Sequence, residues 1–225
     1  MSESPHLHLD VLVSDPAHPV VATMAGWVEA NSGAHRCRLI HDVEDARGGD
    51  ALFLVSCSQI VDEAVRGRYR HTLVLHASDL PQGRGWSPHI WAIVGGAEAV
   101  TLCLLEARDP VDSGDVWRRK QVPIDPGWLH DEINAALFAA EAELMSDWIA
   151  MDAAGARPVP QAVVGGSYLR RRTPKDSELD PERSIAEQFN LLRVADPVRF
   201  PAYVRLHGRN YRVALERLPN ERGER

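Results

Sequence analysis

Two loops of this sequence carry side chains that could move protons and stabilise negative charge. His76 follows the apolar run 72–75 and opens a loop rich in proline and glycine. Asp112 lies in the loop 111–115, which follows the apolar run 100–105. A carboxylate beside an imidazole fixes the ring's tautomer, raises its basicity and stabilises the imidazolium that forms when it accepts a proton. The two residues therefore predict acid–base chemistry, provided that the fold brings the loops together.

Such loops need a sheet whose strands end near one another. Apolar runs that alternate with helical patterns predict a Rossmann-like α/β fold with a mostly parallel, doubly wound sheet. The predicted strands are 9–13, 37–40, 51–55, 72–75, 100–105 and 116–124, and the predicted helices are 19–30, 88–94 and 133–151. Open α/β sheets bind ligands at the carboxyl ends of their strands. Adjacent strand ends are therefore expected to bring Asp112 close to His76.

The composition of the chain changes after the longest predicted helix. We expect residues 1–155 to form the catalytic domain and residues 156–225 to form a small C-terminal extension. Within the extension, residues 184–193 are predicted to be a helix, because they start with the spacing of a capping box. Residues 202–215 are predicted to be a β-hairpin around a Gly-Arg-Asn turn.

Composition excludes several classes of function. The 225 residues carry a net charge of −7, which argues against a protein that holds a nucleic acid by its phosphates. The three cysteines are widely spaced, so neither a disulfide framework nor a metal site is indicated. No signal peptide or membrane span is recognisable, and we expect a soluble protein of the cytoplasm.

The two loops together resemble the folate-dependent formyltransferase family. The resemblance rests on residues 76–81 (His-Ala-Ser-Asp-Leu-Pro), 83–85 (Gly-Arg-Gly) and 112–115 (Asp-Ser-Gly-Asp). That family includes methionyl-tRNA formyltransferase, glycinamide ribonucleotide formyltransferase and nucleotide-sugar N-formyltransferases. Residues 171–180 and 188–193 are similar to the sugar enzymes, most closely to those of pseudaminic-acid-type pathways.

The resemblance implies transfer of a formyl group from 10-formyltetrahydrofolate to a primary amine, without a metal ion. It implies that His76 helps to remove the amine proton and polarises the formyl oxygen, while Asp112 orients the ring. This chemistry is physically consistent, because attack on a formyl carbon creates an oxyanion that a preorganised donor stabilises.

The resemblance also indicates which residues bind the donor and the acceptor. The donor folate is expected to bind against the loop that follows the strand 51–55, where Cys57 contributes by position and not as a nucleophile. The candidate folate-binding residues are Ser56, Cys57, Ser58, Gln59, Val111 and Asp112. The candidate acceptor-binding residues are Ser78, Arg84, Trp86 and Arg171, each of which has a structural alternative: bracing a loop, packing in the core or lying on a solvated face.

One position departs from the family pattern. The family usually has an asparagine two residues before the histidine, and this chain has Val74 there. Loss of an oxyanion donor typically slows a reaction by roughly 100- to 1,000-fold. Either another group replaces the asparagine, with Thr72 on the same strand face as one option, or catalysis is slower.

These observations favour N-formylation of an amino sugar linked to a nucleotide. An enzyme of the methionyl-tRNA formyltransferase type is the first alternative, disfavoured by the acidic net charge and by the lack of a separate basic C-terminal domain. Formylation of a non-nucleotide small amine is another. A folate-binding protein without turnover is an alternative of a different class, motivated by Val74. The oligomeric state stays open, and the apolar hairpin residues pack either on the body of the chain or on a second copy in a homodimer.

Overall fold

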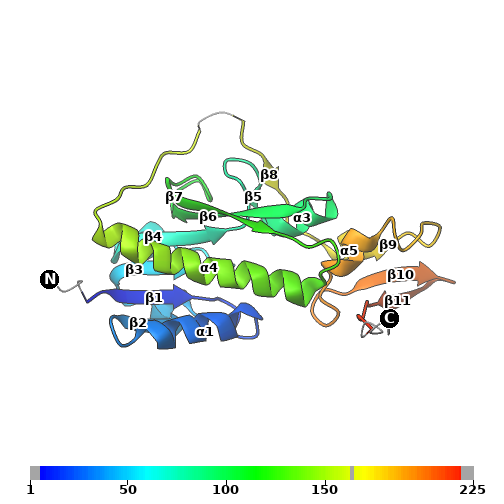
Figure 1. The fold of residues 1–225 in the computed structure, drawn as a ribbon, viewed down its shortest axis with the longest axis horizontal. Coiled ribbons are helices and arrows are strands. Elements are labelled where there is room, and N and C mark those ends of the chain that lie inside the picture. The colour runs from blue at the N-terminus through cyan, green and yellow to red at the C-terminus, as the bar shows by residue number, and fades with distance from the viewer. Residues whose placement is uncertain (1–5, 163–164, 219–225) are drawn as a thin grey trace, which may run out of the picture.

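The fold is built on one six-stranded sheet. The computed structural model describes residues 6–162 and 165–218, and the strands of the sheet are stacked from the bottom of the molecule toward the top in Figure 1. Its strands, in spatial order, are β2 (Arg36–Ile40), β1 (His8–Leu12), β3 (Gly49–Leu54), β4 (Tyr69–His76), β6 (Ala99–Glu106) and β7 (Val116–Pro123). The first four strands are parallel, and β6 and β7 are antiparallel to their neighbours. The predicted mostly parallel, Rossmann-like fold is confirmed.

The direction of β6 corrects one expectation. Two parallel strands that end at one edge were expected to bring Asp112 to His76, and that reason is wrong, because β6 runs antiparallel to β4. The chain leaves β4 through a loop, and the helix that follows, α3 (Pro88–Val94), has only seven residues. That length does not carry the chain back to the amino end of β4. β6 therefore enters the sheet beside His76, which pairs with Cys103, and it ends beside Leu73.

The two faces of the sheet are covered differently. The helices α1 (Val20–Asn31), α3 and α4 (His130–Ala153) contribute to one large core with the strands, and α4 runs along the length of the sheet (Figure 1). Phe53 of β3 packs edge-on between Trp27 and Trp148, with ring centroids 5.7 and 5.5 Å away. Among the described residues, the other face is covered by the 3₁₀ helix η1 (Val43–Asp45), the short helix α2 (Glu63–Arg66) and loops.

A buried charged residue ties three strands together on the thinly covered face. Asp10 of β1 accepts two hydrogen bonds from Arg38 of β2, at 2.8 and 2.6 Å, and a third from the Tyr69 hydroxyl of β4. Burial and the carboxylate raise the pKa of Tyr69 to about 12. Because a buried carboxylate is tolerated only when it is paired, this cluster is structural.

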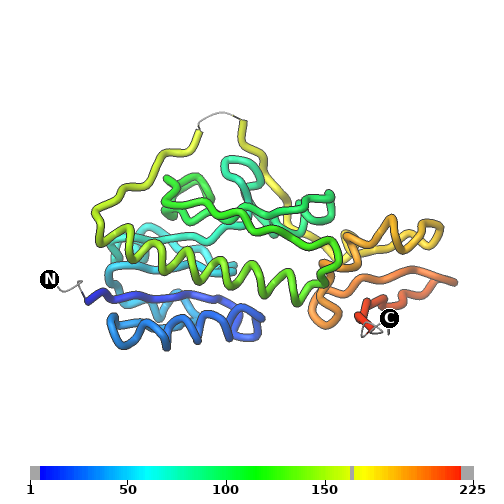
Figure 2. The backbone as a smooth tube through the Cα atoms, viewed as in Figure 1, coloured from blue at the N-terminus to red at the C-terminus, as the bar shows by residue number. Residues whose placement is uncertain are grey.

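The C-terminal segment forms a separate small sheet at the end of the molecule opposite the described N-terminal residues (Figure 1). Residues 155–162 leave α4 and turn back over the edge of the molecule, as the tube in Figure 2 shows. The chain then returns through β8 (Tyr168–Leu169), which pairs with β5 (Arg84–Gly85), and through the 3₁₀ helix η2 (Pro174–Ser177). The small sheet consists of β9 (Glu178–Leu179), β10 (Ala202–Leu206) and β11 (Arg209–Val213).

Two sequence-based expectations in this segment need adjustment. The helix expected over 184–193 is reduced to α5 (Phe189–Arg193). Ser184 and Glu187 do exchange the hydrogen bonds of a capping box, but the chain makes turns after them. The hairpin is present, although its second strand starts at Arg209 because a two-residue turn closes it. Its apolar residues Val204, Val213 and Leu215 pack in the chain's own small core, so the homodimer stays a prediction.

Candidate active site

The structure brings His76 and Asp112 together. The Nδ1 atom of His76 lies 3.6 Å from Oδ1 of Asp112, and its Nε2 atom is 2.9 Å from the carbonyl oxygen of Gly83. Both residues are buried, with 6% and 7% of their surface exposed. Each ring nitrogen thus faces an oxygen, which fixes the plane of the imidazole.

The loop between β6 and β7 carries Asp112 to the histidine. Asp112 has a positive φ of 60°, a conformation that is uncommon for residues other than glycine. Its Oδ2 atom accepts a hydrogen bond of 2.9 Å from the backbone N–H of Gly85. The Gln161 side chain donates to the carbonyl oxygens of Asp112 and Gly114 at 2.9 and 2.7 Å. A Cβ atom at Gly114 would lie 1.8 Å from the carbonyl oxygen of Glu106, so only glycine fits there.

The loop after β4 is held just as firmly. The Ser78 hydroxyl donates to the carbonyl oxygen of Gln82 at 2.7 Å, and the N–H of Gly83 donates to the Ser167 hydroxyl at 2.8 Å. Gly85 has a φ of +98°, and a Cβ there would lie 2.4 Å from the carbonyl oxygen of Leu169. These contacts fix the loop that places the Gly83 carbonyl oxygen against His76.

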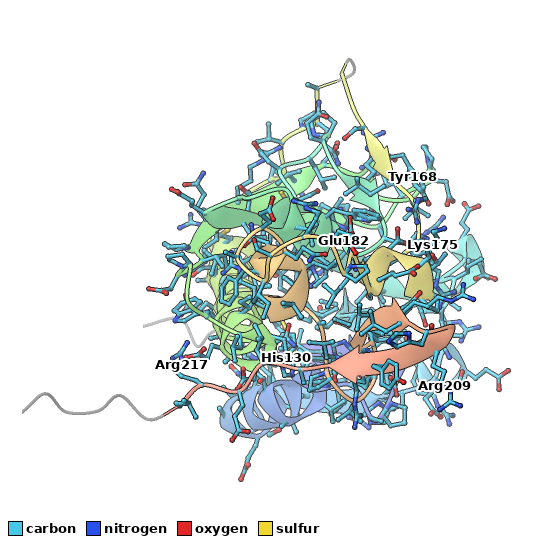
Figure 3. The ribbon with its side chains drawn as sticks, turned by 90° about the vertical axis from the view of Figure 1, so that its right-hand side faces the viewer. His130, Tyr168, Lys175, Glu182, Arg209 and Arg217 are labelled. Carbon is cyan, nitrogen blue, oxygen red and sulfur yellow. The ribbon has the colours of Figure 1, made fainter. Side chains whose placement is uncertain are left out.

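A cleft of about 660 Å³ opens next to the pair. Its lining includes Ala77, the residue after His76, together with Ser14 and Ser56 at the ends of β1 and β3. The C-terminal segment closes it from the other side with Tyr203 and neighbouring residues. Figure 3 views the molecule from this end, where His130 at the start of α4 lies near the small sheet. The volume is that of a pocket for a small molecule.

Comparison with known proteins identifies the family. The family model described as "Formyl transferase" matches residues 12–149, which is more than half of the chain. The chain belongs to the formyl transferase family. Members of this family are transferases that use formyl-tetrahydrofolate.

Individual relatives agree with this assignment. A methionyl-tRNA formyltransferase from Symbiobacterium thermophilum is 31% identical over 67% of this chain and 47% of its own length. One from Cutibacterium acnes is 26% identical over 93% of this chain and 74% of its own length. The chain thus spans about half to three quarters of these relatives.

Solved structures show the same fold. The methionyl-tRNA formyltransferase from Clostridium thermocellum has a TM-score of 0.79 at 15% identity, and 96% of this chain and 95% of that chain align. A sugar N-formyltransferase from a Shewanella species has a TM-score of 0.70 at 16% identity, covering 95% and 99%. HypX from Aquifex aeolicus in complex with tetrahydrofolic acid has a TM-score of 0.74 at 18% identity, covering 94% and 38%.

Of the residues expected to bind folate, Ser56 and Ser58 line the cleft, whereas Cys57, Gln59, Val111 and Asp112 do not. Within the loop after β3, Ser58 bonds to Ser14 and the Gln59 side chain accepts from the N–H of Val43. The Cys57 thiol bonds to the carbonyl oxygen of Gln59, and burial raises its pKa, so it is not a thiolate nucleophile. Two apolar side chains project from the loops that carry these residues, Ile60 with 89% and Val111 with 68% of their surface exposed.

The residues predicted to bind the acceptor fall into two groups. Trp86 and Arg171 line the cleft, and the Arg171 guanidinium stacks over the Trp86 ring at 4.8 Å from its centroid. Ser78 and Arg84 do not line it: Ser78 braces the loop, and Arg84 donates to the Gln161 side chain at 3.2 Å. These two side chains therefore hold the active-site loops in place.

Sequence reasoning missed most of the polar residues of the cleft, among them His18, His89 and Glu141. Burial lowers the pKa of His18 and lowers that of His89 to about 4, so both rings are neutral at pH 7. Glu141 could have been found, because it lies on the stripe of α4 that carries Leu137 and Leu144, where an acidic residue is out of place. His18 and His89 have no comparable signal, since loop and short-helix positions have no burial pattern.

Val74, which stands at the position of the family's asparagine, has a packing role. Val74 contacts the small apolar cluster that contains Leu80, Cys103 and Leu105. The Thr72 hydroxyl is buried without a hydrogen-bond partner among residues 6–162 and 165–218. Val74 has no hydrogen-bond donor to replace the asparagine, and the Thr72 hydroxyl makes no hydrogen bond to His76 or Asp112 among the described residues.

Two classes of feature are absent from the described part of the chain. It contains no cluster of three or more histidine, cysteine, aspartate or glutamate residues that could hold a metal ion. No helix in the same residues has the length and apolar character needed to cross a membrane. The cytoplasmic location stays a prediction.

Proposed function

We propose that this protein transfers a formyl group from 10-formyltetrahydrofolate to the primary amine of a small acceptor. The observation that carries the proposal is the His76–Asp112 pair, which lies behind Ala77 in the wall of a cleft of small-molecule size. The family assignment supports the donor, and the geometry supports the role of each residue.

The reaction moves one proton from the amine to N10 of the folate, by way of His76, and it forms one oxyanion. The amine nitrogen attacks the formyl carbon and forms the new C–N bond, while the carbonyl oxygen takes up negative charge. His76 accepts the amine proton on Nε2, once this atom has exchanged its 2.9 Å contact with the Gly83 carbonyl oxygen for the substrate amine. Asp112 stabilises the resulting imidazolium through its 3.6 Å contact with Nδ1. The bond between the formyl carbon and N10 of the folate then breaks. His76 returns the proton to N10, so that tetrahydrofolate leaves and charge is balanced.

The acceptor that fits best is an amino sugar linked to a nucleotide. Arg171 and Arg172 line the cleft and stack on Trp86 and Trp91, at 4.8 and 5.2 Å from the ring centroids. Arg170 pairs with Asp176, whereas Arg171 and Arg172 form no ion pair among the described residues. A guanidinium held over an aromatic ring and without an ion-pair partner is well placed to bind a phosphate. The diphosphate of a sugar nucleotide supplies such a group.

A second candidate acceptor is methionyl-tRNA. The curated relatives reported above carry the name methionyl-tRNA formyltransferase, which favours this alternative. The net charge of −7 disfavours it, because tRNA binding depends on the neutralisation of many phosphates. A small amine without a nucleotide and a folate-binding protein without turnover are the remaining alternatives.

A direct comparison of acceptors tests the proposal. The protein is incubated with 10-formyltetrahydrofolate and either a nucleotide-linked 4-amino sugar or initiator methionyl-tRNA, and the formylated products are quantified. We expect formylation of the sugar nucleotide. Uptake by tRNA alone would show that the sugar assignment is wrong, and uptake by neither would leave the alternatives of another amine or no turnover.

The His76→Ala variant tests the catalytic pair in the same assay. Loss of a general acid–base typically lowers the rate by about 100- to 10,000-fold, and we expect a loss in that range. Binding of 5-formyltetrahydrofolate, measured by calorimetry, should stay nearly unchanged. His8→Ala, at an exposed position of β1, is the matched control. Full activity of His76→Ala would refute the assigned role.

A further inference from the structure

Glu141 is a buried carboxyl group without a partner at the wall of the cleft. It lies in the middle of α4 and only 7% of its surface is exposed. Its Oε2 atom has no hydrogen-bond partner within residues 6–162 and 165–218, yet the residue contributes to the lining of the cleft. The proposed mechanism does not use it.

The position would accept a leucine more easily than a glutamate. Leu137 and Leu144 precede and follow Glu141 on the same stripe of the helix, and both are buried in the main core. An unpaired buried carboxyl group destabilises a fold, and burial raises the pKa of Glu141 to about 8. Groups of this kind, placed in a cleft, are characteristic of ligand-binding sites.

The described side chains around Glu141 do not pair with its carboxyl group. Asn134 lies two helical turns earlier on the same face of α4 and also lines the cleft. His18 and His89, which line the cleft as well, are neutral at pH 7 because burial lowers their pKa values. Arg199 pairs with Asp15. Arg171 and Arg172 line the same cleft, but no cation among the residues that the structure describes forms an ion pair with Glu141, and burial alone shifts its pKa.

We propose that Glu141 is a specificity-determining residue that binds the ammonium group of a basic acceptor inside the cleft. A cation next to the carboxyl group favours its ionised form, and the resulting charge-assisted hydrogen bonds are stronger than those a hydroxyl group can make. The cleft then has two chemically different parts, the arginines on the tryptophan rings for an anionic group and Glu141 for a basic nitrogen. This inference rests on the proposed function, because it assumes that the amine acceptor occupies this cleft.

A pair of simple ring compounds tests the inference independently of the natural acceptor. Cyclohexylammonium chloride and cyclohexanol have the same ring and differ in the amine, and their binding is measured by the shift in melting temperature at increasing concentration. We expect the ammonium compound to stabilise the wild-type protein more than the alcohol does. In Glu141→Gln its apparent affinity should fall by at least about tenfold, whereas the response to cyclohexanol stays the same.

Glu143→Gln is the matched control, since Glu143 is exposed on the same helix and pairs with Lys120. It should behave like the wild-type protein. Equal stabilisation of the wild type and Glu141→Gln by cyclohexylammonium, or no preference of the wild type for it over cyclohexanol, would overturn the inference.

The acceptor assay described above separates the two possible failures. If the probes depend on Glu141 but no sugar nucleotide is formylated, the proposed acceptor is wrong and the amine site stands. If the sugar nucleotide is formylated equally well by Glu141→Gln and the wild type, the role of Glu141 is wrong and the proposed function stands.

Discussion

At the scale of single residues, unusual backbone conformations cluster around the candidate site. Ser56, Ser87 and Asp112 have positive φ values of 46°, 49° and 60°, although none of them is glycine. Ser56 and Ser87 line the cleft, and Asp112 contacts His76. Non-glycine residues in this conformation are uncommon and persist where the surrounding structure holds them. The strain is therefore located where the loops must present ligand-binding groups.

Substitution of Val74 tests whether the site lacks a donor for the oxyanion. Side chains alternate along β4, so residue 74 shares a face with His76, where the formyltransferase pattern has an asparagine. If no other group stabilises the oxyanion, Val74→Asn should raise kcat by about 10- to 100-fold. Formyl transfer to the accepted amine is the measurement, and Val74→Ala, which adds no donor, is the control. An unchanged kcat in Val74→Asn would mean that another group already supplies this stabilisation.

At the scale of elements, α4 combines a structural and a functional face. Leu144 and Trp148 are completely buried in the main core, while His130, Asn134 and Glu141 reach the cleft from the same helix. A helix that packs on the sheet along its whole length holds these polar groups at fixed spacings. The packed core thus holds the side chains of α4 that line the cleft in fixed positions.

This arrangement predicts a pH dependence of stability that comes from Glu141. Its pKa in the folded protein is about 8, against an ordinary value near 4.5. Between these values the folded state keeps the proton and the unfolded state loses it, so the free energy of unfolding decreases as pH rises from about 4.5 to 8. Each unit of pKa shift corresponds to about 1.4 kcal/mol, and the loss amounts to several kcal/mol.

Urea unfolding of the wild type and Glu141→Gln between about pH 4.5 and pH 9 measures this effect. The difference in unfolding free energy between the two proteins should change steadily up to about pH 8 and then level off. The glutamine side chain that the variant carries does not titrate, so all other groups cancel in the comparison. A difference that stays constant with pH would contradict the assigned burial of Glu141.

At the scale of the whole molecule, the cleft lies where the main sheet meets the C-terminal segment. Residues from the ends of β1 and β3, from α4 and from the segment after β8 line it together. The short pairing of β5 with β8 anchors the C-terminal segment to the loop that holds His76. Positively charged groups gather locally on Trp86 and Trp91, although the chain as a whole is acidic.

Because the positive charge is confined to a few side chains, we expect the KM of the acceptor to depend only weakly on salt concentration. A ligand held through two phosphates should show a KM that rises less than about tenfold between roughly 50 and 200 mM salt. A nucleic acid held through about six to ten phosphates would lose about 1,000-fold or more in affinity over the same range. Steady-state kinetics with the accepted amine at several salt concentrations measures the slope. A steep slope would favour the tRNA alternative.

The sequence by itself determined the order and type of the six main strands and of α1, α3 and α4, because apolar runs and helical periodicity are local properties, but it missed the short elements such as α2, β5 and β8. It also identified His76 and Asp112 through their motifs. Tertiary structure decided that β6 runs antiparallel, and that Asp112 reaches His76 through a hairpin loop held by Gly85 and Gln161. It alone placed Glu141, His18 and His89 in one cleft. Contacts between residues distant in the chain depend on how elements pack, and no local pattern encodes that packing.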